Sequence, residues 1–477
     1  MKHIATRRGL RAALVALVGG ALLLGGATAA HAAPVIDPDA KGSISIHKLK
    51  NPNTAANLPA NGAPQNVASL EPLGGVAFTI AQVDPAKYDL KKNTGWDALK
   101  SLTVETATNL QNQQTKTTTG AGLAEFSTLP LGVYLVKETA APAGVTPAAP
   151  FLITVPLTDP TDTTKWMYDV HVYPKNAVIT ASKSVSDTDA VKVGDTVSWT
   201  ILGAIPNLPT IDGYKITDTL PPALMHKSTT VSLDSGTTTL LPADYTVTPD
   251  GEQNVSVQFT PAGLAKLAAH NTANVKVVII TTVKTVGEIS NSANVYSNAA
   301  SFAIAPGAPG GPLVTAPAVT KFGSVTLRKE SSAAQSPLPG ASFSVYLSES
   351  DARLGMNPVT IDGTSVWTTG PTGEITISGL RFSDFVNGAV VAEGAPGYQK
   401  YWLVETVAPT GHELRAEPIG FTVTKLAQTL TVTDAVSNGG FILPLTGGPG
   451  AFATYAVGAA LLIGTGVLLF RRRRRTA

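Results

Sequence analysis

Lysine and acidic side chains recur in this sequence on strand faces that are otherwise apolar. In an extended strand, residues two apart share a face, so Lys48 lies with two isoleucines and Lys329 with a valine and a leucine. Glu138 and Glu405 share faces with apolar residues in the same way. Burying such a charge costs several kcal/mol unless the charge is paired or neutralised. The ordinary outcome would be a buried salt bridge, or a lysine whose ammonium group reaches solvent at the end of its strand.

The segments that carry these groups form an internal repeat. Residues 42–48 recur as residues 323–329, and residues 134–144 recur as residues 401–411. Each copy therefore has a strand that carries the lysine and a later strand that carries the glutamate. Two related domains flank a different one.

The middle domain holds a comparable pair of groups on unrelated strands. Lys183 shares a face with Ile179 and Ala181, and Asp218 shares a face with Ile216. An inward amine and an inward carboxyl group are thus predicted in each of the three domains.

The composition predicts β-sandwich domains without disulfides. Between its two ends the chain is rich in Thr, Val, Pro and Gly, with turn residues at short intervals and little helical periodicity, which is typical of all-β sandwiches. The 477 residues, less the ends, make about three domains. Because there is no cysteine, any covalent bracing of an exported chain must come from another kind of bond.

The N-terminal end has the pattern of a secretory signal peptide. Basic residues precede an apolar stretch at 12–27, and Ala30, His31 and Ala32 offer a cleavage site. If both ends are removed, they take nine of the 35 lysines and arginines and no acidic residue. The remaining 26 basic and 33 acidic residues give a net charge of −7, so nucleic-acid binding is not indicated.

The C-terminal end combines a short peptide, an apolar run and a basic tail. The peptide is Leu443, Pro444, Leu445, Thr446 and Gly447. The uncharged run at 451–470 would be about 30 Å long as a helix, which matches the hydrocarbon core of a bilayer, and the arginines at 471–475 mark its cytoplasmic side. This order resembles the cell-wall sorting signal of Gram-positive surface proteins. In that family, sortase cleaves between Thr446 and Gly447, holds Thr446 as an acyl-enzyme and passes it to an amine. An ordinary tail anchor is the alternative.

The repeat resembles the Cna-B type immunoglobulin-like domain, whose E-box has the form seen at residues 401–411. In that family a buried lysine attacks the side-chain carbonyl of an Asn or Asp on the last strand, an acid moves the protons, and an intramolecular isopeptide bond results. Desolvation suits this chemistry because it lowers the pKa of the lysine and raises that of the acid. The resemblance implies that Lys329 is the nucleophile, Glu405 the acid and Asp434 the acceptor, with Asn438 as the other acceptor candidate. In the N-terminal copy the possible triad is Lys48, Glu138 and Asn176.

The middle domain resembles the Cna-A-like middle domain of pilins. That resemblance implies that Lys183 is a nucleophile and Asp218 its acid, with an acceptor somewhere in residues 287–298. Asn291 has the same strand parity as the apolar residues that follow it, so we choose it as the acceptor. The alternatives are Asn294 and Asn298.

Residues 166–176 resemble the pilin motif of sortase-assembled pili, whose lysine is the amine acceptor. Val170 and Val172 alternate as in a strand, and Pro174 ends ladder pairing, so Lys175 is expected to emerge where pairing stops. The resemblance implies that sortase joins Thr446 of one copy to Lys175 of another. Such head-to-tail addition is open-ended and makes a fibre. A surface lysine without this role is the alternative.

Together these motifs resemble the major backbone pilins of actinobacteria over essentially the whole chain. The expected fold is all-β, with three tandem immunoglobulin-like sandwiches of Cna-B and Cna-A type. The predicted organisation is a signal peptide at 1–32, an N-terminal domain at 33–175, a middle domain at 176–304, a Pro/Gly linker at 305–320, a C-terminal domain at 321–440 and a sorting signal at 441–477.

The expected function is that of the structural shaft subunit of a covalent pilus at the cell surface. A monomeric, wall-anchored adhesin that binds a host protein or glycan is the alternative. Implied partners are a class C-type pilus sortase, other copies of the chain, minor tip or base pilins, peptidoglycan through a housekeeping sortase, and a possible host receptor. We expect no enzymatic turnover, cofactor or metal, because the seven histidines show neither metal-ligand spacing nor a Ser/His/Asp arrangement.

Overall fold

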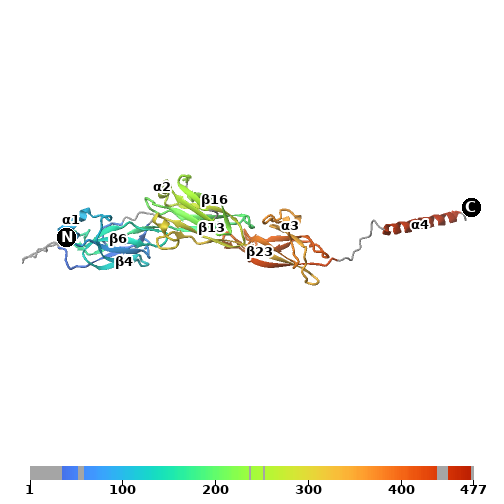
Figure 1. Cartoon of the computed structure of the whole chain (residues 1–477), viewed down its shortest axis with the longest axis horizontal. Helices are drawn as coiled ribbons and strands as arrows, with labels where there is room; N and C mark the ends of the chain where they lie inside the picture. The colour runs from blue at the N-terminus through green and yellow to red at the C-terminus, as the bar shows by residue number, and fades with distance from the viewer. Residues whose placement is uncertain (1–34, 52–57, 236–237, 251–252, 438–448, 474–477) are drawn as a thin grey trace, which may run out of the picture. The chain divides into compact units, whose positions relative to one another are not determined.

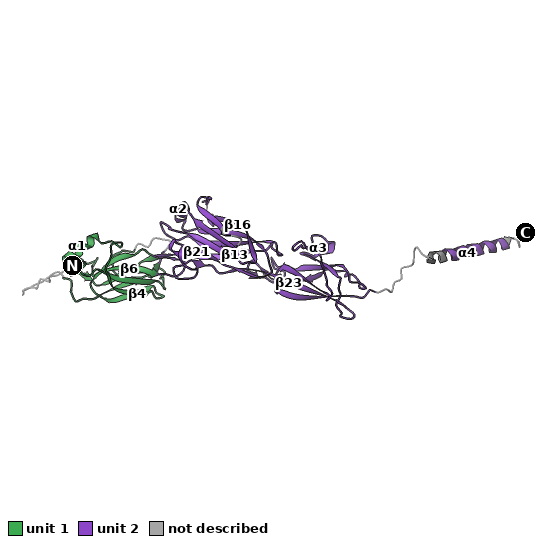
Figure 2. Cartoon of the chain, in the orientation of Figure 1, with its two compact units in different colours: residues 1–49, 56–139, 148–175 green, residues 50–55, 140–147, 176–477 purple. Residues whose placement is uncertain are grey.

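The computed structural model describes residues 35–51, 58–235, 238–250, 253–437 and 449–473 (Figure 1). The predicted signal peptide at 1–32, the peptide at 443–447 and Asn438 lie outside the described residues. The chain forms two compact units, which Figure 2 colours separately. The first contains residues 1–49, 56–139 and 148–175, and the second contains residues 50–55, 140–147 and 176–477.

The first unit is built from two main sheets. Its elements are β1 (Gly42–His47), β3 (Ala77–Val83), α1 (Asn93–Ala98), η1 (Leu99–Ser101), β4 (Leu110–Thr117), β5 (Leu123–Leu129), β6 (Gly132–Ala140), β8 (Phe151–Val155), β9 (Leu157–Thr158), β10 (Trp166–Met167) and β11 (Asp169–Val172). In one sheet β1 lies between β5, which is antiparallel to it, and β11, which is parallel to it. The other sheet has the order β4-β3-β6-β8. Ile44 and Ile46 of β1 are fully buried, as the alternating pattern predicts.

The second unit begins with the strands of the predicted middle domain. Two short strands, β2 (Leu49–Lys50) and β12 (Lys175–Val178), lie where the chain passes between the units. The other elements of this part are β7 (Val145–Thr146), β13 (Ala181–Ser186), β14 (Thr196–Ala204), β15 (Lys215–Thr219), β16 (Leu224–Leu233), β17 (Tyr245–Asp250), β18 (Asn254–Phe259), α2 (Pro261–Ala269), β19 (Asn274–Val283), β20 (Gly287–Asn291), β21 (Ala293–Tyr296), η2 (Ala300–Ala303) and β22 (Leu313–Val314). They form one sheet of order β13-β14-β19-β16 and another of order β17-β18-β15-β21-β22.

The rest of the second unit corresponds to the predicted C-terminal domain. Its elements are β23 (Ala318–Ser331), β24 (Ser342–Tyr346), α3 (Glu349–Leu354), β25 (Trp367–Thr368), β26 (Glu374–Arg381), β27 (Phe385–Val386), β28 (Ala389–Val390), β29 (Tyr401–Val407), β30 (Ile419–Phe421) and β31 (Ala427–Asp434). The helix α4 (Pro449–Arg473) falls in the predicted sorting signal. One sheet has the order β20-β23-β26, with β31 also paired to β23, and another has the order β25-β24-β29-β30. The predicted all-β fold is confirmed.

Strand β23 is shared by the middle and C-terminal parts of the second unit. Its first residues pair with β20, from Asn291 opposite Ala318 to Gly287 opposite Phe322, and its later residues pair with β26 and β31. The stretch 305–320, predicted as an extended linker, therefore contains β22 and the beginning of β23. It differs from a linker because Ala318 and Thr320 are buried and hydrogen-bonded into a sheet.

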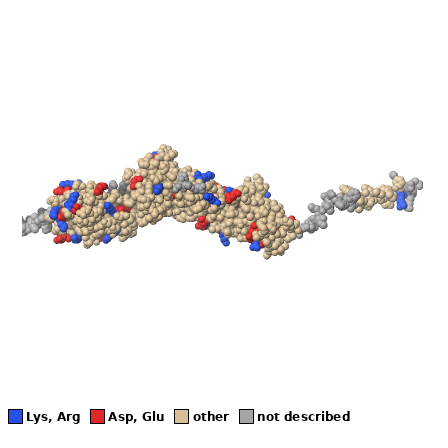
Figure 3. Space-filling view, viewed as in Figure 1, with Lys and Arg blue, Asp and Glu red and all other residues tan. Residues whose placement is uncertain are grey.

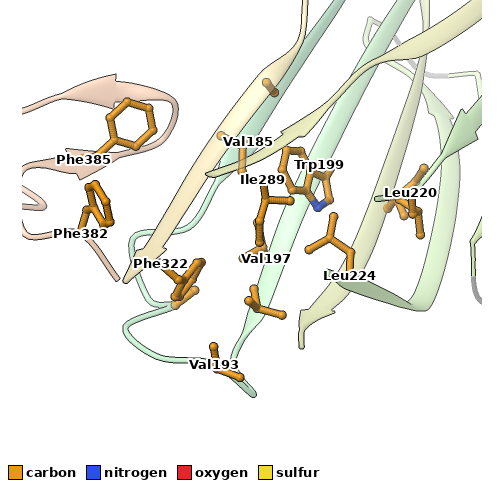
Figure 4. Packing of buried hydrophobic residues seen from close by; sticks show 14 of the residues in the cluster. Val185, Val193, Val197, Trp199, Leu220, Leu224, Ile289, Phe322, Phe382 and Phe385 are labelled. Carbon is orange, nitrogen blue, oxygen red and sulfur yellow. The ribbon is translucent and has the colours of Figure 1, made fainter. Parts of the chain in front are cut away.

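A continuous hydrophobic core follows this shared strand. Figure 4 shows Val185, Val197 and Ile289 of the middle part pointing into one core. Phe322 of β23 belongs to the same cluster, as does Phe382 of the C-terminal part. Charged side chains of both signs lie interspersed on the face that Figure 3 shows, which agrees with a modest net charge.

The C-terminal helix α4 contains the run predicted to span a membrane. Its side chains are described from residue 455 to residue 471. Among the described residues, no helix is both long and apolar enough to cross a membrane. The span predicted at 451–470, which starts before the first described side chain, is thus not confirmed.

Candidate functional site

The predicted C-terminal triad is brought together by three strands. Because β23 and β31 run parallel, with Lys329 opposite Val432, the amine of Lys329 forms an ion pair with the carboxylate of Asp434. Its Nζ atom also lies 3.0 Å from Glu405 Oε1, without hydrogen-bond geometry. All three side chains are fully buried. Asp434 Oδ2 has no hydrogen-bond partner, so the acceptor carboxyl group is only partly satisfied.

Glu405 is the group in this triad whose environment favours the protonated form. Desolvation raises the pKa of Glu405, and the positive charge of Lys329 and the hydrogen bond from the backbone N–H of Arg415 oppose that rise. A carboxyl group that keeps its proton can donate it, as a general acid must.

The middle triad is assembled by β13, β15 and β20. Lys183 Nζ donates to Asp218 Oδ2 at 2.6 Å, and Asn291 Nδ2 donates to the same oxygen at 3.5 Å. Asp218 therefore lies between the predicted nucleophile and the predicted acceptor. Burial lowers the pKa of Lys183 to about 8 against the opposing effect of Asp218, and burial raises the pKa of Asp218. Asn291 Oδ1 is buried without a hydrogen-bond partner.

The two alternative acceptors of the middle part have other contacts. Asn294 Nδ2 donates to Thr217 Oγ1 at 3.2 Å. Asn298 Oδ1 accepts from the backbone N–H of Ser301 at 2.9 Å. Neither contact involves Asp218, so the geometry favours Asn291 among the three.

In the first unit, Lys48 and Glu138 form a buried ion pair. Lys48 Nζ donates to Glu138 Oε2 at 2.9 Å, and both side chains are at most 1% exposed. Burial lowers the pKa of Lys48, and the carboxylate of Glu138 opposes that effect. Asn176 is also buried, at 1% exposure, and it belongs to the second unit.

An aromatic ring accompanies each of the three buried lysines, and the sequence analysis missed these rings. The distance from Nζ to the ring centroid is 5.5 Å in two cases and 5.4 Å in the third. The rings belong to Phe78, Trp199 and Phe343. Each stands in a strand at a buried position, so alternation could have placed it inward but not beside a lysine. A ring excludes water from the amine while its face still tolerates a cation.

Lys175 lies in the lining of a pocket of the first unit. The pocket has a volume of about 740 Å³. Its lining is mostly apolar and comprises Leu58, Pro59, Ala60, Gly62, Leu99, Leu102, Val133, Phe151, Leu152, Ile153, Thr154, Leu157, His171, Val172, Tyr173, Pro174 and Lys175. Lys175 is the first residue of β12, so a strand begins at the residue where pairing was expected to stop. The lysine is partly exposed rather than fully solvated.

Two histidines near this pocket were not singled out by the sequence analysis. His47 ends β1 and His171 stands in the neighbouring strand β11, and a hydrogen bond of 2.9 Å joins His47 Nε2 and His171 Nδ1. In its own strand, each histidine shares a face with polar residues, so the sequence gave no reason to expect the two rings to meet. Among the described residues no group of three or more His, Cys, Asp or Glu could hold a metal ion.

Comparisons with known proteins agree with this picture. A model described as "Gram-positive pilin subunit D1, N-terminal domain" matches residues 39–177, and a "Prealbumin-like fold domain" model matches residues 323–436. Fimbrial subunit type 1 of Actinomyces viscosus is 33% identical over 532 aligned positions, which cover all of this chain and 99% of that protein. Fimbrial subunit type 2 of Actinomyces naeslundii is 32% identical and covers 99% of this chain and 98% of its own. The full-length major pilin SpaD of Corynebacterium diphtheriae matches with a TM-score of 0.68 at 29% identity, over 85% of this chain and all of that structure.

Proposed function

This chain belongs to the family of Gram-positive fimbrial subunits, and on that premise we propose that a sortase joins its Thr446 to Lys175 of the next copy. The protein is a structural subunit of a pilus, and it polymerises with other pilin subunits at the cell surface. The observation that carries the proposal is the position of Lys175 in the lining of a pocket, on the strand that follows β11. A pocket next to an amine gives a peptidyl enzyme intermediate a place to approach.

The proposed transfer has two steps. The sortase thiolate attacks the carbonyl of Thr446, the amine of Gly447 leaves with the C-terminal segment, and Thr446 stays on the enzyme as a thioester. The Lys175 amine of another copy then attacks that thioester, gives up a proton to solvent, expels the thiolate and forms an amide. Each copy has one donor and one acceptor, so the chain grows head to tail.

A second amide chemistry would brace the domains from within. In the middle part, Lys183 would attack the side-chain carbonyl of Asn291 and release ammonia, with Asp218 moving the protons. In the C-terminal part, Lys329 would attack Asp434 and release water, with Glu405 as the acid. The buried contacts of the two sets support this proposal, since each acid lies within 3.0 Å of its lysine. Each bond forms once, so no turnover is implied.

A bond in the first unit is the extension of this proposal. Lys48 and Glu138 have the contact, the burial and the aromatic neighbour that the other two lysine–acid pairs have. Asn176 would supply the acceptor carbonyl. Further partners under this proposal are a class C-type pilus sortase, minor tip or base pilins, peptidoglycan through a housekeeping sortase, and a host receptor.

The test is polymerisation on the cell surface. Extracts boiled in detergent should show a ladder of covalent multimers for the wild-type protein. Lys175→Ala should abolish the ladder and leave the monomer, whereas Lys165→Ala, a matched change of an exposed lysine in the same unit, should leave the ladder intact. A ladder that persists in Lys175→Ala would reject Lys175 as the acceptor. A wild-type protein that remains monomeric beside active sortase would favour a wall-anchored adhesin instead.

A further inference from the structure

The paired histidines in the first unit are joined end to end. The nitrogen–nitrogen distance is 2.9 Å, the ring centroids are 5.2 Å apart and the ring planes differ by only 20°. That centroid separation is close to the nitrogen–nitrogen distance plus two ring radii. The rings of His47 and His171 thus lie nearly in one plane, and one nitrogen donates a hydrogen bond directly to the other.

The pair is connected to the segment that leads to Lys175. The ring of Tyr173 stacks on that of His47, with centroids 4.8 Å apart and planes 13° apart. The Tyr173 hydroxyl oxygen accepts from the backbone N–H of Gln65 at 2.7 Å, and the backbone N–H of His171 donates to the carbonyl of Gly62 at 2.7 Å. Gly62, His171, Tyr173 and Lys175 all line the pocket, so the pair adjoins the two contacts that connect His171 and Tyr173 to the 62–65 segment of the pocket wall.

The bridge tolerates one added proton but not two. When both rings are neutral, one N–H donates and the facing nitrogen accepts. One added proton on the donor ring keeps that geometry and strengthens the bond with charge. A second added proton places two N–H groups and two positive charges against each other at 2.9 Å, which excludes the bond. Burial and the neighbouring His171 lower the pKa of His47.

Lys48, which follows His47 in the chain, pairs with Glu138 in the core, and the nearest carboxylates on β11 and β5 are exposed. On β11, Asp169 shares the face of His171 and accepts a hydrogen bond from Ser43 at 2.7 Å. On β5, Glu125 stands opposite Ser45, the neighbour of His171, and is exposed. Tyr173 and Lys175 follow in the chain, and the described loop residues 58–66 contribute no ionisable side chain. Water screens the two exposed carboxylates, so they do not replace the lost bridge when both rings are charged.

We propose that the His47–His171 pair is an acid-sensitive latch on the wall of the acceptor pocket. When the hydrogen bond is present, it holds Tyr173 and the segment before Lys175 in place; when both rings carry a proton, the bond is lost and transfer to Lys175 falls. The effect on transfer rests on the function proposed above, whereas the opening of the latch does not.

The first test needs only the wild-type chain. With ¹⁵N-labelled histidine, scalar coupling between the two bridged nitrogens is expected at pH 8 and should be absent at pH 5. Over the same range, exchange of the Gln65 amide hydrogen should rise at least about tenfold above its intrinsic pH dependence. The absence of coupling at pH 8, or coupling that persists at pH 5, would overturn the latch.

The second test measures transfer. Sortase would attach a labelled peptide containing the 443–447 sequence to the wild type, to His47→Phe, and to His226→Phe as the control in the second unit. Taking the ratio of each variant to the wild type cancels the pH dependence of the enzyme. Between pH 8 and pH 5 the rate of Lys175 labelling in the wild type should fall about tenfold relative to the rate in His47→Phe, which has no ring nitrogen to protonate at this position. Relative to the rate in His226→Phe it should not change. Equal profiles for all three proteins would overturn the latch. No labelling of Lys175 in any protein at any pH would reject the proposed function, and the nitrogen coupling would then decide the latch alone.

Discussion

At the scale of single residues, burial turns a lysine into a nucleophile. With a pKa of about 8, Lys183 is neutral in roughly a tenth of the molecules at pH 7. A solvated lysine is neutral in only about a few molecules in ten thousand at that pH. Burial also raises the pKa of Asp218, so both pKa shifts favour the state in which Asp218 is protonated and Lys183 is neutral. Moving that proton within the pair changes no net charge, which lets the reaction start in a dry core.

A variant that cannot form the middle bond should reveal this shift in its stability. Asn291→Ala removes the acceptor and keeps the lysine–acid pair. Because the folded-state pKa of Lys183 lies below its unfolded value of about 10.5, the unfolded chain binds more protons between pH 8 and pH 10.5, and stability rises with pH in that window. We expect the exchange free energy of amides in β14 to rise by about 2 kcal/mol from pH 8 to pH 10. Adding Lys183→Met to this variant should remove the rise, and a rise of the same size in both would contradict the assignment.

Strand alternation alone placed the buried charged groups correctly. Lys48, Lys183 and Lys329 were each predicted on an apolar face, and each side chain is fully buried. What alternation cannot supply is the identity of neighbours across strands. His47 and His171 meet because β1 and β11 pair in parallel across more than a hundred residues, and no local pattern encodes that pairing.

At the scale of strands, the parallel pair of β23 and β31 joins the beginning and the end of the C-terminal part. The ladder runs from Ser324 opposite Ala427 to Ser331 opposite Asp434. A bond from Lys329 to Asp434 would close a loop of about 105 residues, which the chain-entropy model values at roughly 4 to 5 kcal/mol. Tension that enters on one strand and leaves on the other would pass through that bond and not through the hydrogen bonds of the ladder.

Glu405→Gln should separate the bond from the packing around it. The amide keeps the shape of the carboxyl group but cannot act as the acid, so Lys329 and Asp434 should remain unreacted. The expected results are an intact mass about 18 Da above that predicted for the bonded chain, and unfolding of the C-terminal part that is easier by about 4 kcal/mol. Glu374→Gln, an exposed glutamate on β26, which pairs with the strand of Lys329, is the matched control and should change neither value. If the wild-type mass shows no loss of water, this bond does not exist.

At the scale of the whole molecule, the middle and C-terminal parts of the second unit, from Ile179 to Val432, share one core and one strand. The sequence suggested a boundary at 305–320 because Pro and Gly are frequent there, and composition alone could not show that Ala318 to Phe322 continue a sheet. Burial does alternate in 318–322, but a threonine faces inward and a valine outward, so the residue types gave no alternating signal to set against the Pro and Gly that precede them. The internal repeat identified the two related copies, but it did not show how firmly the second is joined to the middle part.

A buried aspartate fastens the two parts of this unit beside the shared strand. Asp187, which follows β13, accepts hydrogen bonds from the backbone N–H of Asn387 at 2.6 Å and from the hydroxyl of Thr320. Its own N–H donates to Asn387 Oδ1 at 2.9 Å. The side chain links the middle part, β23 and the β27–β28 turn, so it couples segments that are 200 residues apart in the chain.

Asp187→Ala should destabilise the junction between the middle and C-terminal parts more than it destabilises the core of either part. The change leaves the buried hydroxyl of Thr320 without its acceptor, which costs about 1 to 3 kcal/mol, and it removes the acceptor of the part-buried backbone N–H of Asn387. We therefore expect the amides of β20 and of the β27–β28 turn to exchange through a partial opening that the wild type lacks, while the core amides of β14 keep their protection. Asp189→Ala, an exposed carboxylate two residues away, is the control and should exchange like the wild type. If Asp187→Ala leaves exchange at the turn unchanged, the shared strand alone holds the two parts together, and the aspartate only fills its pocket.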